Sequence, residues 1–167
     1  KVFTMTSKER ILTALAGGIP DTVPCAPDMS NMIPCRLTGK PFWDIYLYND
    51  PPIWRAYADA VKFFGFDGWL PSVPKEFPYE TAENAAKPKW QEAIILKTDE
   101  RIYTRQYAEI DGKTAWSETC NVYYIDNSPT LNIPLSKLEM SEKPPETWED
   151  VFPRNKFSGL EAYKDAA

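Results

Sequence analysis

Two stretches of the sequence carry apolar residues at helical spacing. The first predicts a helix over residues 7–16, because Thr6 and Glu9 form a capping box and a glycine pair supplies a left-handed stop. The second predicts a helix that starts after Asn49 and its two prolines and ends at Gly65. The apolar face of this second helix is expected to pack against the protein and consists of Ile53, Trp54, Tyr57, Val61 and Phe64.

Short apolar runs follow both predicted helices. Residues 23–26 and 68–70 have the length and composition of buried strands, whereas residues 27–48 and 72–89 are expected to be long loops. Helices that alternate with short apolar strands are typical of a parallel α/β sheet.

The periodicity changes from 3.6 to 2 after residue 100. Residues 101–110 alternate, the Asp111-Gly112 pair is the favoured two-residue turn, and residues 113–119 would form the return strand of a hairpin. Further edge strands are predicted at 122–124 and 131–133, and further helices at 144–151 and 159–167.

The composition narrows the classes of function. The 167 residues carry a net charge of -5 with no basic stripe, so nucleic acid is not an expected partner, and no apolar run is long enough to span a membrane. Three irregularly spaced cysteines argue against a disulfide framework and for a cytoplasmic location. Because the chain contains no histidine, it cannot supply histidine-based acid–base catalysis or histidine ligands to a metal.

Three motifs near the start of the chain occur in a recognisable order. They are Met5-Thr6-Ser7-Lys8-Glu9-Arg10, Pro20-Asp21-Thr22-Val23-Pro24 and Phe64-Gly65-Phe66-Asp67-Gly68. The series resembles the opening of the uroporphyrinogen decarboxylase superfamily, particularly its corrinoid-linked methyltransferase branch, and the resemblance covers most of residues 5–151. The chain departs from the pattern at Thr22, where the family usually has arginine.

The resemblance implies the N-terminal part of a (β/α)8 TIM-type barrel with an antiparallel β-hairpin insertion. Residues 1–167 would form a single incomplete barrel domain. Residues 5–71 would hold the N-terminal helix and the first two β/α units, 72–135 a loop and the hairpin, and 136–167 the return helices. An unfinished barrel leaves strand edges uncovered, so the chain is expected to need its missing C-terminal half or a complementary chain, and could form a homo-oligomer.

The two branches of the superfamily imply different chemistry. The decarboxylases place an arginine-rich loop after the first strand, whereas residues 26–35 contain no arginine. The resemblance therefore favours the methyltransferase branch. It implies zinc, held by ligands outside this chain, and a corrinoid, with a corrinoid protein and a small-molecule substrate as partners. The alternative is a decarboxylase-like enzyme acting on a modified tetrapyrrole or another carboxylated substrate.

Barrel enzymes place functional residues in the loops that follow their strands. Asp28 and Asn31 follow the first predicted strand, and Trp69 and Ser72 follow the second, so these four are the candidate substrate-binding residues. No catalytic residue is assigned. The plainer interpretation makes Asp28 part of a solvated turn and Trp69 part of the core.

Two other groups of residues invite a functional interpretation. Cys25 and Cys35 lack the spacing of a metal site and are expected to be buried thiols. Tyr103, Arg105 and Tyr107 share one face of the hairpin, where they would cover a neighbouring surface or stack on a flat ligand. The second possibility describes a non-catalytic binding or assembly module, which is the alternative to an enzyme.

Overall fold

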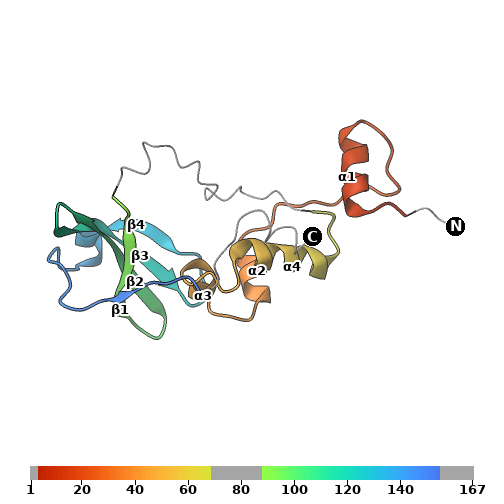
Figure 1. Cartoon of the computed structure of the whole chain (residues 1–167). Helices are drawn as coiled ribbons and strands as arrows, with labels where there is room; N and C mark the ends of the chain where they lie inside the picture. Colours follow the sequence, from red (N-terminus) through yellow and green to blue (C-terminus); the bar gives the residue numbers. More distant parts are fainter. Residues whose placement is uncertain (1–3, 69–87, 155–167) are drawn as a thin grey trace.

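The computed structural model describes residues 4–68 and 88–154 of the chain. One five-stranded sheet has the strand order β4-β3-β2-β1-β5, and every neighbouring pair is antiparallel (Figure 1). Consecutive strands from β1 to β4 pair with each other, as short connections between antiparallel strands allow. The strands are β1 (Gln91–Lys97), β2 (Arg101–Ile110), β3 (Lys113–Tyr124), β4 (Thr130–Pro134) and β5 (Glu149–Asp150).

The four α-helices of the described residues lie at one side of the sheet (Figure 1). Helix α3 packs against β3, α2 packs against α4, and α1 lies away from the others (Figure 1). The helices are α1 (Ser7–Leu15), α2 (Met32–Leu37), α3 (Phe42–Tyr46), α4 (Ile53–Phe64) and the 3-10 helix η1 (Leu135–Leu138). Within the described ranges, none of the helices has the length and apolar character that crossing a membrane would require.

The predicted fold class, the N-terminal part of a (β/α)8 barrel, is wrong. The sheet is antiparallel throughout, and residues 23–26 form no strand, since Val23 is 88% exposed. The backbone of Cys25 instead bonds to Asp67, since the Cys25 carbonyl oxygen accepts a 2.7 Å hydrogen bond from the Asp67 amide. A four-residue apolar run without a neighbouring strand cannot bury its side chains, and none of the described strands pairs with this run. Residues 69 and 70 of the second predicted strand lie outside the described residues.

The hairpin prediction is confirmed. Asp111 and Gly112 both have left-handed backbones, with φ of 51° and 72°, and Ile110 pairs with Lys113 across the turn. The predicted strands at 113–119 and 122–124 are one strand, β3. A register shift bends it, because Arg105 pairs with Cys120 whereas Tyr107 pairs with Trp116.

The two edges of the sheet are short. The predicted strand at 131–133 is confirmed as edge strand β4, in which Asn132 has a left-handed φ of 57°. The predicted helix at 144–151 is wrong, because this segment contributes the two-residue strand β5 at the other edge. Pairing with β1 supplies partners for its backbone, and Val151 N donates to Glu92 O at 2.9 Å. A short helix at these residues would be less stable than this pairing, since helix nucleation costs free energy.

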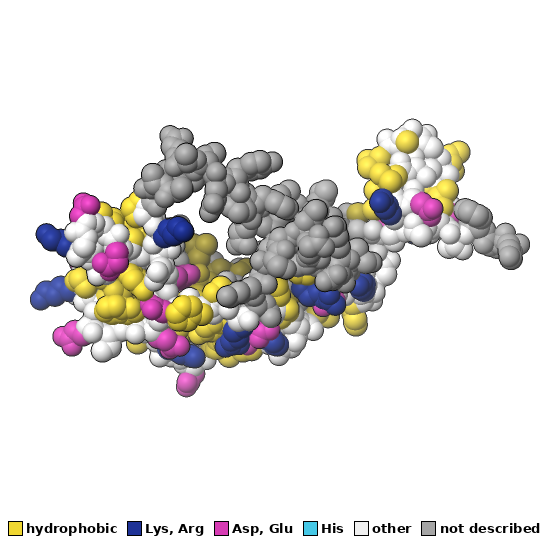
Figure 2. All heavy atoms as spheres, in the orientation of Figure 1, with side chains coloured by type: hydrophobic (Ala, Val, Ile, Leu, Met, Phe, Trp, Pro, Cys, Tyr) yellow, Lys and Arg dark blue, Asp and Glu magenta, His cyan; other side chains and the backbone are white. Residues whose placement is uncertain are grey.

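Helix α1 agrees with its prediction at both ends. Glu9 N donates to Thr6 Oγ1 at 3.3 Å, Thr6 N donates to the Glu9 carboxylate at 2.8 Å, and Gly17 adopts a left-handed φ of 77°. Its apolar face, in contrast, is largely uncovered, since Leu12 and Leu15 are 54% and 79% exposed. Figure 2 shows hydrophobic side chains on the surface of this part of the molecule.

The helices that follow differ from their prediction in detail. The expected loop at 27–48 contains α2 and α3. Helix α4 ends at Gly65 as predicted, but its most buried side chains are three alanines, and Phe64 of the predicted apolar face is 45% exposed. A buried face made of small side chains does not show in the spacing of the larger residues. The buried alanines are Ala56, Ala58 and Ala60.

The core joins the sheet to the helical part. Leu47, just after α3, packs with Ile94, Ile102 and Tyr123 on one face of the sheet. A second cluster, of Cys35, Phe42 and Ile45, lies between α2 and α3. The segment that contains η1 lies over the opposite face of the sheet, where Leu135 is 2% exposed.

Candidate functional site

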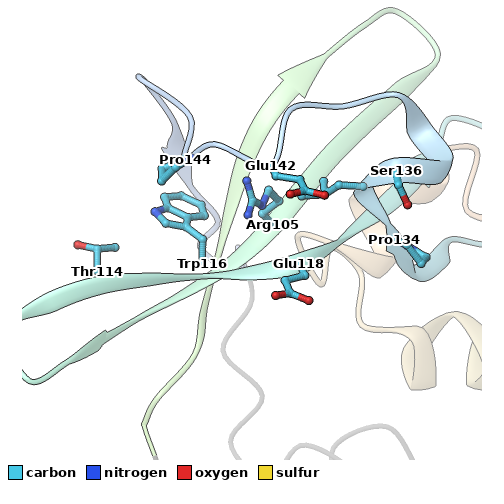
Figure 3. A pocket seen from close by; sticks show the side chains of 9 residues that line it. Arg105, Thr114, Trp116, Glu118, Pro134, Ser136, Glu142 and Pro144 are labelled. Carbon is cyan, nitrogen blue, oxygen red and sulfur yellow. The ribbon is translucent and has the colours of Figure 1, made fainter.

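A cavity of about 470 Å³ lies where β2 and β3 meet the segment that follows β4 (Figure 3). The hairpin positions its floor, since Arg105 stands on β2 and Trp116 on β3, while residues 134–144 form the opposite side. Its size is within the range of small-molecule sites. The lining residues are Arg105, Thr114, Trp116, Glu118, Pro134, Leu135, Ser136, Glu142 and Pro144.

Arg105 is the buried cation of this cavity, with only 4% of the residue exposed. Its Nε and Nη2 atoms donate to the Ser117 carbonyl oxygen at 3.1 and 2.6 Å, and Nη1 donates to the Lys143 carbonyl at 3.2 Å. The guanidinium carbon lies 5.5 Å from the centre of the Trp116 ring. Burial lowers the pKa of Arg105 because a charge loses its hydration there.

An aromatic cluster borders the cavity. The Trp116 ring centroid lies 5.1 Å from that of Tyr107 and 5.2 Å from that of Trp148. The Tyr107 hydroxyl lies 2.6 Å from Gln91 Oε1 and 2.7 Å from Asp150 Oδ1, so the ring is held between β1 and β5. The cluster fixes one wall of the cavity and leaves Trp148 45% exposed.

The opposite face of the sheet carries a network centred on one carboxylate. Glu92 Oε1 on β1 accepts hydrogen bonds from Thr104 Oγ1 on β2, and from Asn121 Nδ2 and the Tyr123 hydroxyl on β3, the last two at 3.0 Å. The three donor residues are nearly or fully buried. Burial, and then the nearby carboxylate, raise the pKa of Tyr123, so its hydroxyl keeps its proton and remains a donor. The network binds three strands together.

The sequence-predicted site residues do not form one site. Asp28 and Asn31 are both exposed and lie near Tyr57 of α4, whose hydroxyl is 2.5 Å from Asn31 Oδ1 and 2.7 Å from the Met29 carbonyl. Burial and the negative charge of Asp28 raise the pKa of Tyr57. Neither residue lines the cavity described above. Trp69 and Ser72, the other two candidates, lie outside the described residues.

The cysteines only partly match their prediction. Cys35 is buried as expected, and its burial raises the thiol pKa to about 11, whereas Cys25 is exposed. Among the described residues, no group of three or more histidine, cysteine or acidic side chains could hold a metal ion. The zinc that the family resemblance implies therefore does not fit the described part of this chain.

One charged residue from each of the three motifs takes part in a single ion-pair cluster. Arg10 Nε lies 2.7 Å from Asp21 Oδ1, and Arg10 Nη1 also pairs with Asp67. Asp67 in turn accepts a 2.8 Å hydrogen bond from Cys25 N. The hydrogen bonds from Arg10 and from the Met5 amide lower the pKa of Asp21, and the Cys25 amide lowers that of Asp67. The cluster connects α1 to the end of α4.

Comparisons of the chain with protein families, with curated proteins and with solved structures each found no match.

Two important features escaped the sequence analysis. Glu92 stands two positions before Ile94, which would place an acid on the buried face of a strand, but no strand was predicted there. Trp116 belongs to a predicted strand, yet only the covering segment at 134–144 makes it a cavity wall. An acid in phase with core residues is the signal that could have found Glu92.

Proposed function

We propose that this chain belongs to a uroporphyrinogen-decarboxylase-like protein that takes part in corrinoid-dependent methyl transfer. The observation that carries the proposal is the meeting of Arg10, Asp21 and Asp67. These residues come from three separate motifs of the resemblance, up to 57 positions apart. A chance likeness of short motifs would give no reason for their charged residues to form one cluster.

The proposal does not depend on a barrel in this chain. It assigns the chain a role in binding substrate or partner, because the chain has no histidine and its described residues offer no metal site. The zinc ligands would come from a C-terminal half or a complementary chain, and a corrinoid protein would be the methyl-carrying partner. Three free thiols suit the cytoplasmic location that goes with this role.

The test is methyl transfer by the protein as it occurs. The chain is purified from its source through an affinity tag, together with any polypeptide bound to it. Thiol-dependent loss of the methyl group from methylcobalamin is then followed by absorbance, with and without added zinc. We expect demethylation that needs both the accompanying polypeptide and a thiol. Preparations that retain the accompanying polypeptide but leave methylcobalamin unchanged, whichever thiol is added, would refute the proposal.

A pair of variants separates the motif cluster from a general effect on α1. Arg10→Met removes the cation on which both aspartates converge and is expected to reduce the recovered activity or the bound partner. Lys8→Met removes an exposed charge from the same helix and serves as the matched control. Equal behaviour of the two variants would remove the support that the cluster gives to the proposal.

A further inference from the structure

Arg105 is a buried cation without an anionic partner. Its described hydrogen-bond acceptors are the carbonyl oxygens of Ser117 and Lys143, and no carboxylate among the described residues pairs with it. Of its five N–H groups, these contacts use one on each nitrogen. One N–H on each terminal nitrogen has no acceptor within the described ranges. The carbonyl groups and the Trp116 ring that contact this buried guanidinium carry no net negative charge, so the site favours an anionic ligand group there.

The rest of the cavity does not favour a simple anion. The side chains of Glu118 and Glu142 also line it, and a ligand that carried only negative charge would be repelled by both. Figure 3 shows Arg105, Trp116 and Glu142 on the same side of β3, with Pro144 next to the indole ring. One cavity thus presents a cation, a carboxylate and an aromatic face.

We infer that this cavity binds a small zwitterion of the α-amino acid type. The ligand carboxylate would accept from the two remaining N–H groups of Arg105, and its ammonium group would pair with Glu142. The ligand side chain would lie against Trp116 and Pro144. The volume of about 470 Å³ accommodates a ligand of this size. This site is independent of the proposed methyl transfer, because it uses only residues of the sheet and its covering segment.

Matched ligands test which charges the cavity requires. The standard α-amino acids are titrated into the chain by isothermal calorimetry, with tryptophan fluorescence as a second readout. The tightest binder is then compared with its amide, which lacks the carboxylate, and with its deaminated acid, which lacks the ammonium group. We expect millimolar or tighter binding of the amino acid and at least about tenfold weaker binding of both analogues.

Each contrary outcome refutes the inference. Failure of every amino acid to bind at millimolar concentration would show that no such site exists. A deaminated acid that binds as tightly as the amino acid would make this an anion site, and an equally tight amide would make it a cation site. None of these results bears on methylcobalamin demethylation, so the two proposals fail separately.

A surface variant avoids the risk that changing Arg105 unfolds the chain. Glu142→Gln is expected to weaken the amino acid about tenfold and to leave the deaminated acid unchanged or tighter, because only the ammonium contact is lost. Glu146→Gln, an exposed position of the same segment outside the cavity lining, is the control. Loss of affinity in both variants, or in neither, would overturn the assignment of Glu142.

Discussion

Glu92 is the acceptor that holds three nearly or fully buried strand side chains, so its removal should cost far more than removal of one donor. Glu92→Ala leaves Thr104, Asn121 and Tyr123 without their shared acceptor. An unsatisfied buried donor costs about 1–3 kcal/mol. Water that enters the vacated space can accept hydrogen bonds from some of these donors. The expected loss of unfolding free energy is therefore about 4 kcal/mol.

Tyr123→Phe provides the contrast on the same network. It removes one hydrogen bond to the carboxylate and leaves Glu92 with two donors, so the expected loss is only about 1.5 kcal/mol. In urea unfolding followed by circular dichroism, a slope of about 2 kcal/mol per M converts these losses to midpoint shifts of about 2 M and 0.7 M.

The control for this experiment is an exposed glutamate of the same sheet. Glu118→Ala on β3 removes a carboxylate of the same size and should change the midpoint little. Equal shifts for Glu92→Ala and Tyr123→Phe would refute the conclusion that one carboxylate supports all three donors. A shift for Glu92→Ala no larger than that of the control would show that the network adds nothing to stability.

Three further results are expected. Asp21→Asn should destabilise the chain at neutral pH, because the pKa of Asp21 is lowered in the folded protein and its charge stabilises that state. The difference between the two forms should start to shrink as the pH falls below about 4 and vanish only as the pH falls through the lowered folded pKa; unfolding of both forms across pH checks this. Gly112→Val should lower the unfolding free energy by about 1 kcal/mol or more, measured in urea, since φ there is 72°. A thiol reagent should label Cys25 at once but Cys35 and Cys120 only on unfolding; immediate labelling of all three would contradict their burial.

The sequence predicted the elements that local chemistry determines. The capping box of Thr6 and Glu9, the glycine at the end of α4 and the Asp111-Gly112 turn each act within a few residues, so one sequence contains the whole signal. The arrangement of the strands depends on which segments cover each other. No strand was predicted at the apolar run 93–96, although it forms most of β1.

The wrong predictions have a common physical cause. Residues 23–26 and 144–151 have suitable local composition for a strand and a helix, but the hydrogen bonds that each makes come from distant parts of the chain. Pairing with Asp67 in one case and with β1 in the other outweighs local propensity. The cavity also depends on distant contacts, since Arg105 donates a hydrogen bond to the carbonyl of Lys143, a residue 38 positions away.

The form of the two sheet edges has a consequence for association between molecules. Strand β5 offers two residues, and the left-handed Asn132 interrupts the extended backbone of β4. Neither β4 nor β5 presents the long, flat row of N–H and C=O groups that lets strands of separate molecules add to one another. Strand addition onto β4 or β5 is therefore disfavoured by backbone geometry, and replacing Asn132 with a β-branched residue would weaken that protection at β4.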